Sequence, residues 1–236
     1  LSDNGMSFPY SKTNCYLFST HTPWIVRWPG RIKPGQVDTH FISGIDYMPT
    51  VIEAAGLEPV PGMDGKSFMP LLNAQDQTGR DCVFTVFEEQ VARVQYPMRC
   101  LQNANYGYIY NAWSDGKRTF KNEPMGSISW RAMQASTDPK IAERVKHFLY
   151  RTPEELYDLK ADPNSLRNLA GDPKHKAALE AMRKQLLDNM TRTEDHILPA
   201  FKEYLSSGKQ IWQPEVRQRF PGGRKRAGKQ KAADQK

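Results

Sequence analysis

Three polar residues near the N-terminus have side chains that could bind a metal ion and an anion. Asp3 and Asn4 offer a carboxylate and an amide carbonyl, the hard oxygen ligands that Ca²⁺ or Mg²⁺ prefers. Gly5 lets the backbone turn sharply after them. Lys12 follows Asn4 by eight residues and could place a positive charge beside an anionic substrate. Taken alone, Asp-Asn-Gly is more often an ordinary turn, and Lys12 could equally be a solvated surface lysine.

The elements that would position these residues begin with a strand and a helix. Residues 23–29 have a β-branched and aromatic centre closed by Pro29-Gly30, which predicts a short strand. A helix is then expected with Asp46 as its N-cap, Pro49 in its first turn and Gly56 at its C-terminal end. Residues 57–80 are rich in Pro, Gly and Asp and indicate a long connection.

A second unit is expected from about Asp81. Residues 82–87 read as a buried strand, and residues 98–102 with 106–113 read as a hairpin that turns at 103–105. Two helices with Asp-Pro starts follow, at 138–149 and 172–190. The second of them carries a buried stripe of Leu179, Met182, Leu186 and Met190. This order predicts the end of an α/β domain followed by a smaller α+β unit with a short antiparallel sheet and a terminal helix.

The cysteines and the apolar segments exclude several classes of protein. Cys15, Cys82 and Cys100 are an odd set without CxxC spacing, so we expect free or buried thiols and neither a zinc site nor a disulfide framework. No apolar run approaches the roughly 20 residues that a membrane span needs, so no membrane partner is expected. The chain opens on Leu1 and not on Met, and we expect an N-terminal portion to be missing from it.

The formal charge of +7 is concentrated at the C-terminus. Residues 221–236 contain six basic residues and one acidic residue, so this segment carries +5 of the total. We interpret it as a solvated, disordered tail and expect no nucleic-acid partner. The alternative is a non-catalytic module that binds polyanions through this tail.

Several segments together resemble the sulfatase family of the alkaline-phosphatase-like superfamily. Independent matches that occur in the expected order are harder to obtain by chance than one triplet. Ser2 to Gly5 with Phe8-Pro9 and Thr13-Asn14, and later 96–99, resemble most the sulfamidase (heparan N-sulfatase) subgroup. The other matching segments are 25–30, 46–56, 65–72, 155–159, 162–163 and 168–170.

The resemblance implies a fold, an activity and a set of roles. It implies hydrolysis of sulfate esters or sulfamates of glycans, with a sulfated glycan as partner. Asp3 and Asn4 would be two ligands of one Ca²⁺, and Lys12 would contact the sulfate. It also implies a periplasmic or extracellular location. Expected boundaries are 1–75 for the C-terminal part of the catalytic domain, 76–205 for an α+β subdomain and 206–236 for the basic tail.

The chain departs from the family pattern in one decisive way. Sulfatases use a formylglycine made within Cys/Ser-x-Pro-x-Arg, and none of the three cysteines begins that motif. The nucleophile is therefore expected in the missing N-terminal part, and this chain alone should be inactive. The alternative within the superfamily is a phosphoesterase or phosphonate hydrolase, which typically needs two zinc ions and more histidine ligands.

Four further residues have candidate roles at this stage. Glu88, Glu89 and Arg99 could face a substrate cleft, although ordinary edge-strand charge is the favoured interpretation. His21 stands where many sulfatases have Arg, which leaves its role open.

Overall fold

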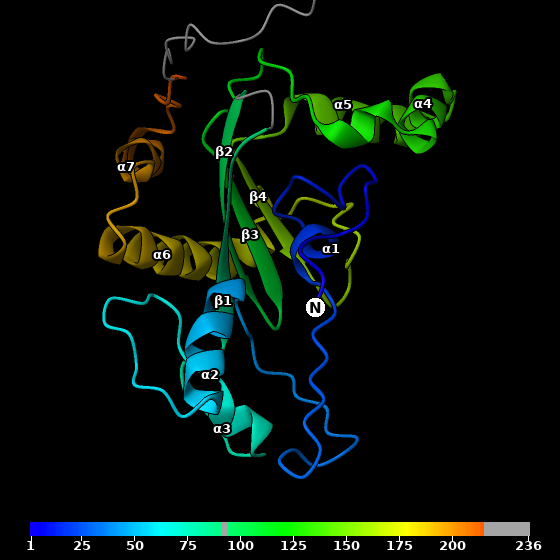
Figure 1. Cartoon of the computed structure of the whole chain (residues 1–236). Helices are drawn as coiled ribbons and strands as arrows, with labels where there is room; N and C mark the ends of the chain where they lie inside the picture. The colour runs from blue at the N-terminus through cyan, green and yellow to red at the C-terminus, as the bar shows by residue number, and fades with distance from the viewer. Residues whose placement is uncertain (91–93, 215–236) are drawn as a thin grey trace, which may run out of the picture.

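A computed structural model of the chain describes residues 1–90 and 94–214. Its centre is a four-stranded antiparallel sheet in the order β1-β2-β3-β4 (Figure 1). The strands are β1 (Cys82–Glu89), β2 (Gln95–Asn103), β3 (Tyr106–Asn111) and β4 (Glu154–Asp158). The register pairs Thr85 with Cys100 and Cys100 with Ile109. The expected strand at 82–87 and the expected hairpin are thus confirmed.

The hairpin turn forms where the three-residue segment 103–105 predicts it. The Asn103 side chain accepts hydrogen bonds from the backbone N–H groups of Asn105 (2.9 Å) and Tyr106 (2.8 Å). An asparagine that satisfies two backbone donors in this way replaces the ladder bonds that end at the turn.

Helices α6 (Lys176–Arg192) and α7 (Leu198–Ser207) cover one face of the sheet. The predicted stripe of α6 is buried, and it packs with Leu101, Tyr108 and Leu156 from the strands. Asp172 caps the short 3₁₀ turn Pro173–His175 that precedes α6, through the Lys174 N–H at 3.0 Å. The Asp-Pro start therefore begins as a 3₁₀ turn and continues as the α-helix.

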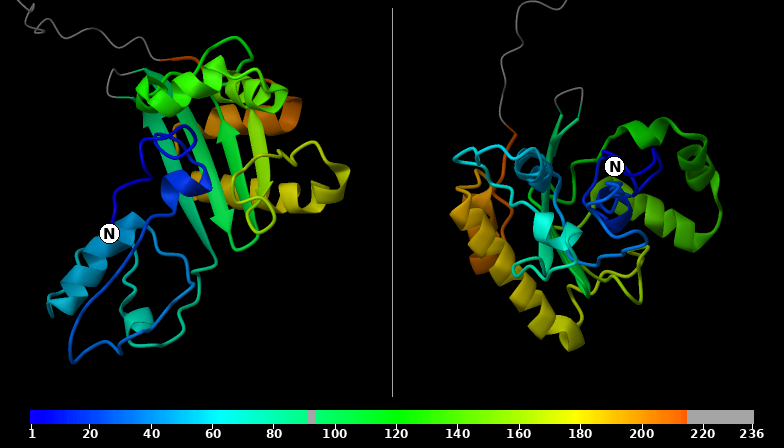
Figure 2. Two further views of the ribbon diagram at one scale, coloured as in Figure 1. Left: turned by 90° about the vertical axis from the view of Figure 1, so that its right-hand side faces the viewer. Right: turned by 60° about the horizontal axis from the view of Figure 1, so that its bottom comes forward.

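The N-terminal segment and two further helices cover the other face (Figure 2). These elements are α1 (Leu17–Thr20), the 3₁₀ turn η2 (Glu123–Gly126), α4 (Ile128–Ala135) and α5 (Pro139–Tyr150). Asp138 caps α5 by accepting from the Lys140 N–H at 2.8 Å, as the sequence predicts. Because strand side chains alternate, Met98, Cys100 and Ile109 point to this face and pack with Tyr10, Cys15 and Tyr16.

Residues 21–80 extend beyond one end of the sheet and carry the 3₁₀ turn Gly44–Asp46, α2 (Tyr47–Ala54) and α3 (Met69–Leu72) (Figures 1 and 2). The predicted strand at 23–29 is wrong, since these residues have no strand conformation. A strand needs a neighbour for its backbone groups, and the described residues pair no segment with this one. Ile25 is accordingly 84% exposed.

The helix expected after Asp46 is present, but Asp46 acts differently from a simple cap. It occupies the N-cap position without a capping bond to α2. Its buried carboxylate instead accepts from the N–H groups of Ser43 and Lys66, both at 2.8 Å, and from Arg80 at 2.5 Å. Asp46 therefore joins three segments of the extension. Gly56, just after the C-terminal end of α2, has φ +68°, as expected of a glycine that ends a helix.

In the described part of the chain, none of the helices combines the length and the apolar character that a membrane span requires. Residues 215–236, which include most of the predicted basic tail, lie outside the described residues.

Candidate functional site

The N-terminal loop, residues 3–14, contains all three residues singled out in the sequence. The two ends of this loop come together at Gly5. A Cβ atom on Gly5 would lie 2.0 Å from the Phe18 carbonyl oxygen and 2.1 Å from that of Ser11. The backbone at residue 5 therefore lies against residue 11, which brings Asn4 and Lys12 to the same end of the loop.

The Asp3-Asn4 turn is held by bonds to residues 19–23. The Ser2 N–H donates to the Pro23 carbonyl at 3.3 Å, and the Gly5 N–H donates to the Ser19 carbonyl at 3.2 Å. The Ser2 hydroxyl donates to the Asn4 carbonyl at 3.0 Å. Asp3 is exposed and Asn4 is half-buried, so the carboxylate of Asp3 remains accessible to a cation.

The residues on either side of Lys12 are anchored in the core. Tyr10 donates to the Arg144 carbonyl at 2.8 Å, and Asn14 accepts from Arg151 at 2.7 Å. Tyr10 (φ 68°) and Thr13 (φ 55°) both have left-handed backbone conformations. Such conformations are costly for non-glycine residues and persist where the surroundings hold them. The turn that carries Lys12 is therefore fixed by the core beneath it.

Residues from the connection between β3 and α4 complete the surroundings of Lys12. The Lys12 ammonium lies 2.9 Å from Glu123 Oε2. Asn122 donates to the Thr13 hydroxyl at 2.8 Å and to the Lys12 carbonyl at 3.4 Å. The hydrogen bond from Lys12 lowers the pKa of Glu123. Sequence reasoning missed both residues, which are about 110 positions away and carry no local signal.

A buried network below the loop joins it to β4 and α5. Glu155 is fully buried and accepts from Tyr16 (2.7 Å), Tyr157 (2.5 Å) and Asn111 (2.7 Å). Burial alone would raise the pKa of Glu155. The charges of His147 and Arg151 and the hydrogen bonds outweigh it and lower the pKa to about 2. This carboxylate therefore stays ionised and acts as a fixed centre of the network.

The candidate ligands are suitable for a hard cation but do not complete a site. Ca²⁺ takes six to eight oxygen ligands, and Asp3 and Asn4 offer two side chains. In residues 1–90 and 94–214, no group of three or more His, Cys, Asp or Glu side chains gathers as a metal site. The oxygen donors thus fit part of a calcium site, and further ligands would have to come from elsewhere.

The cysteines are unsuited to act as nucleophiles. Cys15 and Cys100 are 1% exposed, and all three thiols are free, as expected. Burial raises the pKa of Cys15 to about 12 and that of Cys100 well above its usual value. Because the thiolate is the reactive form, these two thiols are inert.

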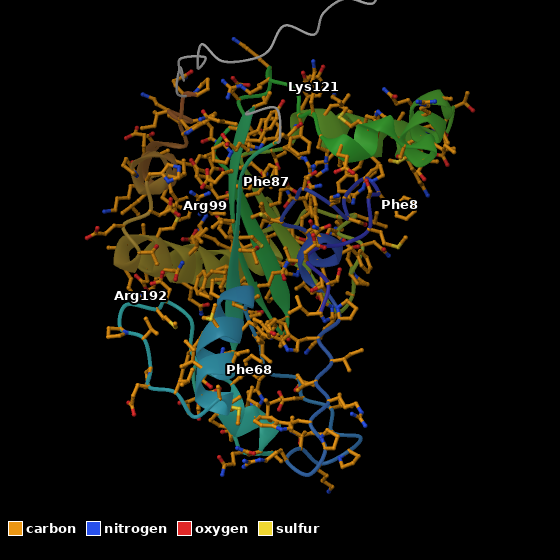
Figure 3. The ribbon with its side chains drawn as sticks, in the orientation of Figure 1. Phe8, Phe68, Phe87, Arg99, Lys121 and Arg192 are labelled. Atoms are coloured by element: carbon orange, nitrogen blue, oxygen red, sulfur yellow. The ribbon has the colours of Figure 1, made fainter. Side chains whose placement is uncertain are left out.

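Arg99 and Glu88 lie on the opposite face of the sheet from Lys12. Arg99 is 3% exposed and binds Asp195 through Nε at 2.5 Å and Nη2 at 2.8 Å. Glu88 also contacts Arg99 at 2.5 Å. Figure 3 shows Arg99 on the α6 and α7 side and Phe8, from the N-terminal loop, on the other. Arg99 and Glu88 therefore stabilise the packing of α7 and do not face the same site as Lys12.

Comparisons with known proteins agree with the family resemblance. A family model described as "N-sulphoglucosamine sulphohydrolase, C-terminal" matches residues 7–114, which include Lys12 and the β-hairpin. The human N-sulphoglucosamine sulphohydrolase is 29% identical over 82% of this chain and 41% of its own length. An ulvan-active sulfatase from Formosa agariphila is 28% identical over 95% of this chain and 44% of its own length.

Two further similarities extend this result. The bovine N-acetylglucosamine-6-sulfatase is 30% identical over 72% of this chain and 30% of its own length. A solved structure from Bacteroides thetaiotaomicron, described with the metabolism of multiple glycosaminoglycans, has a TM-score of 0.50 and 21% identity. It covers 76% of this chain and 32% of that chain.

The chain shares its fold with that solved structure, and its small antiparallel sheet covered by helices agrees with the expected α/β architecture. The chain is similar to sulfatases over most of its length, and residues 7–114 match the C-terminal family model of N-sulphoglucosamine sulphohydrolase. It spans less than half the length of the curated relatives described above.

Proposed function

We propose that this chain is part of a sulfatase that hydrolyses sulfate ester or sulfamate groups of glycans. The observation that carries the proposal is the closure of the N-terminal loop at Gly5. It brings Asn4 and Lys12, residues suited to bind a cation and a sulfuryl oxygen, to one end of a loop anchored in the core. The names of the relatives, which include sulfatases of glucosamine sugars, support the substrate class.

Asp3 and Asn4 would supply two of the oxygen ligands for a Ca²⁺ ion. When bound, this ion would act as a Lewis acid that withdraws electrons from the sulfuryl oxygens. The exposed carboxylate of Asp3 and the half-buried amide of Asn4 agree with such a role.

Lys12 would contact the sulfuryl group and stabilise the negative charge that gathers on it in the transition state. A fixed charge in a site with little water contributes about 3 kcal/mol, as the loss of one oxyanion donor does in other enzymes. The lysine is held for this role by its anchored neighbours and not by its own flexible side chain.

The nucleophile would come from outside this chain. The inert thiols of Cys15 and Cys100 and the absence of Cys-x-Pro-x-Arg at all three cysteines support this step. We therefore infer that these 236 residues alone do not hydrolyse sulfate. The resemblance to the sulfatase family also implies that the whole protein would be exported to the periplasm or the cell exterior.

The test uses the full-length protein that contains this chain. Release of inorganic sulfate is measured from N-sulfoglucosamine and from N-acetylglucosamine 6-sulfate, before and after removal of Ca²⁺ by a chelator. The expected result is sulfate release that the chelator abolishes and added Ca²⁺ restores. Calorimetry should also show weaker Ca²⁺ binding by Asp3→Ala. Hydrolysis of phosphate or phosphonate esters instead of sulfates would contradict the proposal.

A further inference from the structure

Glu123, which lies outside the N-terminal loop, forms an ion pair with the Lys12 ammonium. It opens η2, and its two carboxylate oxygens have different partners. Oε2 lies 2.9 Å from the Lys12 ammonium, and Oε1 accepts from the Ser7 hydroxyl at 3.2 Å. The side chain of Glu123 is 60% exposed, against 28% for that of Lys12. A ligand that approaches Lys12 from solvent therefore meets the carboxylate of Glu123 beside it.

The neighbouring residues fix the distance between Glu123 and Lys12. Asn122 is 8% exposed and binds both the Thr13 hydroxyl and the Lys12 carbonyl. Pro124, on the other side of Glu123, is buried. The backbones that carry the two charges are thus joined, so the position of Glu123 is a property of the fold.

Resting on the function proposed above, we propose that Glu123 is a specificity-determining residue that selects against a second anionic group next to the scissile sulfate. A vicinal hydroxyl or amine can donate a hydrogen bond to this carboxylate. A vicinal sulfate or carboxylate would be repelled by it. The preferred substrate is therefore a sugar whose neighbouring substituent is a hydrogen-bond donor.

The electrostatic argument depends on the carboxylate being charged when the substrate binds. Lys12 lowers the pKa of Glu123, so this group is ionised at neutral pH. Like charges a few ångströms apart at a protein surface repel by enough to change relative rates by about tenfold. A hydroxyl in the same position is uncharged, so the carboxylate does not repel it.

The test compares two pairs of substrates with the full-length enzyme and its variants. The first pair is N-sulfoglucosamine with its vicinal 3-hydroxyl free or sulfated. The second is N-acetylglucosamine 6-sulfate with its 4-hydroxyl free or sulfated, where one further carbon separates the two groups. For each hydrolysed pair, kcat/KM is measured for the wild type, Glu123→Gln and Glu123→Asp. Glu143→Gln is the control, because Glu143 is an exposed glutamate on α5 outside the site.

The expected result is a wild type that prefers the singly sulfated sugar. Glu123→Gln should reduce this preference about tenfold, whereas Glu123→Asp and Glu143→Gln, which keep the charge at position 123, should retain it. A preference that Glu123→Gln leaves unchanged would overturn the inference while the sulfatase proposal stands. A wild type that hydrolyses neither pair would overturn both.

Discussion

At the scale of single residues, Gly5 decides whether the N-terminal loop can close. A Cβ atom on residue 5 would lie 2.0–2.1 Å from the carbonyl oxygens of Phe18 and Ser11, which leaves no space for a methyl group. Both of these oxygens are backbone atoms. We predict that Gly5→Ala lowers the free energy of unfolding by about 1–3 kcal/mol or more, as overpacking against rigid atoms does. Urea unfolding measures the change.

The matched control for this prediction is Gly126→Ala. Gly126 has no heavy atom within 4 Å of the position where a Cβ would be built. Its substitution should change the unfolding free energy by less than about 0.5 kcal/mol, the usual range for surface sites. Equal effects of the two substitutions would show that the loop does not close at Gly5.

Glu155 makes the stability of the chain depend on pH. Its pKa is about 2 in the folded state, below its usual value of about 4.5. Because the folded pKa is depressed, the stabilisation is present above pH 4.5 and is lost as the pH falls toward 2. By linkage this amounts to about 3 kcal/mol.

The measurement for Glu155 is urea unfolding of the wild type and of Glu155→Gln between pH 7 and pH 2. The wild type should lose more stability than the variant as the pH falls from about 4.5 toward 2. Curves that stay parallel over this range would contradict the depressed pKa.

Sequence reasoning can predict candidate site residues when their signal is local. Asp3, Asn4 and Lys12 lie within ten positions, so a resemblance in one short segment is enough to predict all three. Glu123 and Asn122 could not be found, because their link to Lys12 exists in the folded chain alone. Arg99 shows the reverse case, since its charge suggests a substrate contact until the fold places Asp195 against it.

At the scale of elements, the aspartates Asp46 and Asp138 look alike in the sequence but have different roles. Each precedes a helix with an early proline. Asp138 caps α5 through one exposed bond to Lys140. The buried Asp46 instead accepts from two backbone N–H groups and pairs with Arg80, which is 6% exposed.

These two roles predict different costs of substitution. Asp138→Ala should destabilise the chain by about 1 kcal/mol, the usual cost of a lost cap. Asp46→Ala should cost about 3–5 kcal/mol, because it leaves the Arg80 guanidinium buried without its carboxylate. Thermal unfolding of the two variants checks the difference, and a cost of Asp46→Ala no larger than that of Asp138→Ala would contradict it.

The sequence predicts well those elements that are determined by their own residues and close neighbours in the chain. Caps, the Asn103 turn and the stripe of α6 each depend on neighbouring positions. The expected strand at 23–29 fails because a strand also depends on a partner elsewhere. Strand β4 was not expected as a strand for the same reason, since its pairing with β3 spans about 50 residues.

At the scale of the whole molecule, the chain combines a well-packed part with an exposed one. Both faces of the sheet are covered, and clusters of aromatic and aliphatic side chains fill the two layers. The extension instead exposes large apolar side chains, among them Ile25, Ile45, Tyr47, Met48 and Val51. Because the sulfatase relatives are more than twice as long, we expect these side chains to contact other parts of the full-length protein.

The N-terminal loop is positioned by the layers that are well packed. Tyr10, Asn14 and Tyr16 are buried with α5 and β4. Tyr10 donates to the Arg144 carbonyl, Asn14 accepts from Arg151, and Tyr16 donates to Glu155. In the proposed sulfatase, this chain therefore holds Lys12 and the Asp3-Asn4 pair in place. The nucleophile would come from another part of the protein.

The most direct test of this account is the rate of sulfate release by the full-length protein with Lys12→Ala. The account predicts a fall in kcat of about 100-fold or more, as removal of a charge-stabilising donor typically causes. Lys146→Ala, at an exposed lysine of α5, should leave the rate unchanged. A Lys12→Ala enzyme that releases sulfate within about twofold of the wild-type rate, less than 1 kcal/mol, would contradict the account.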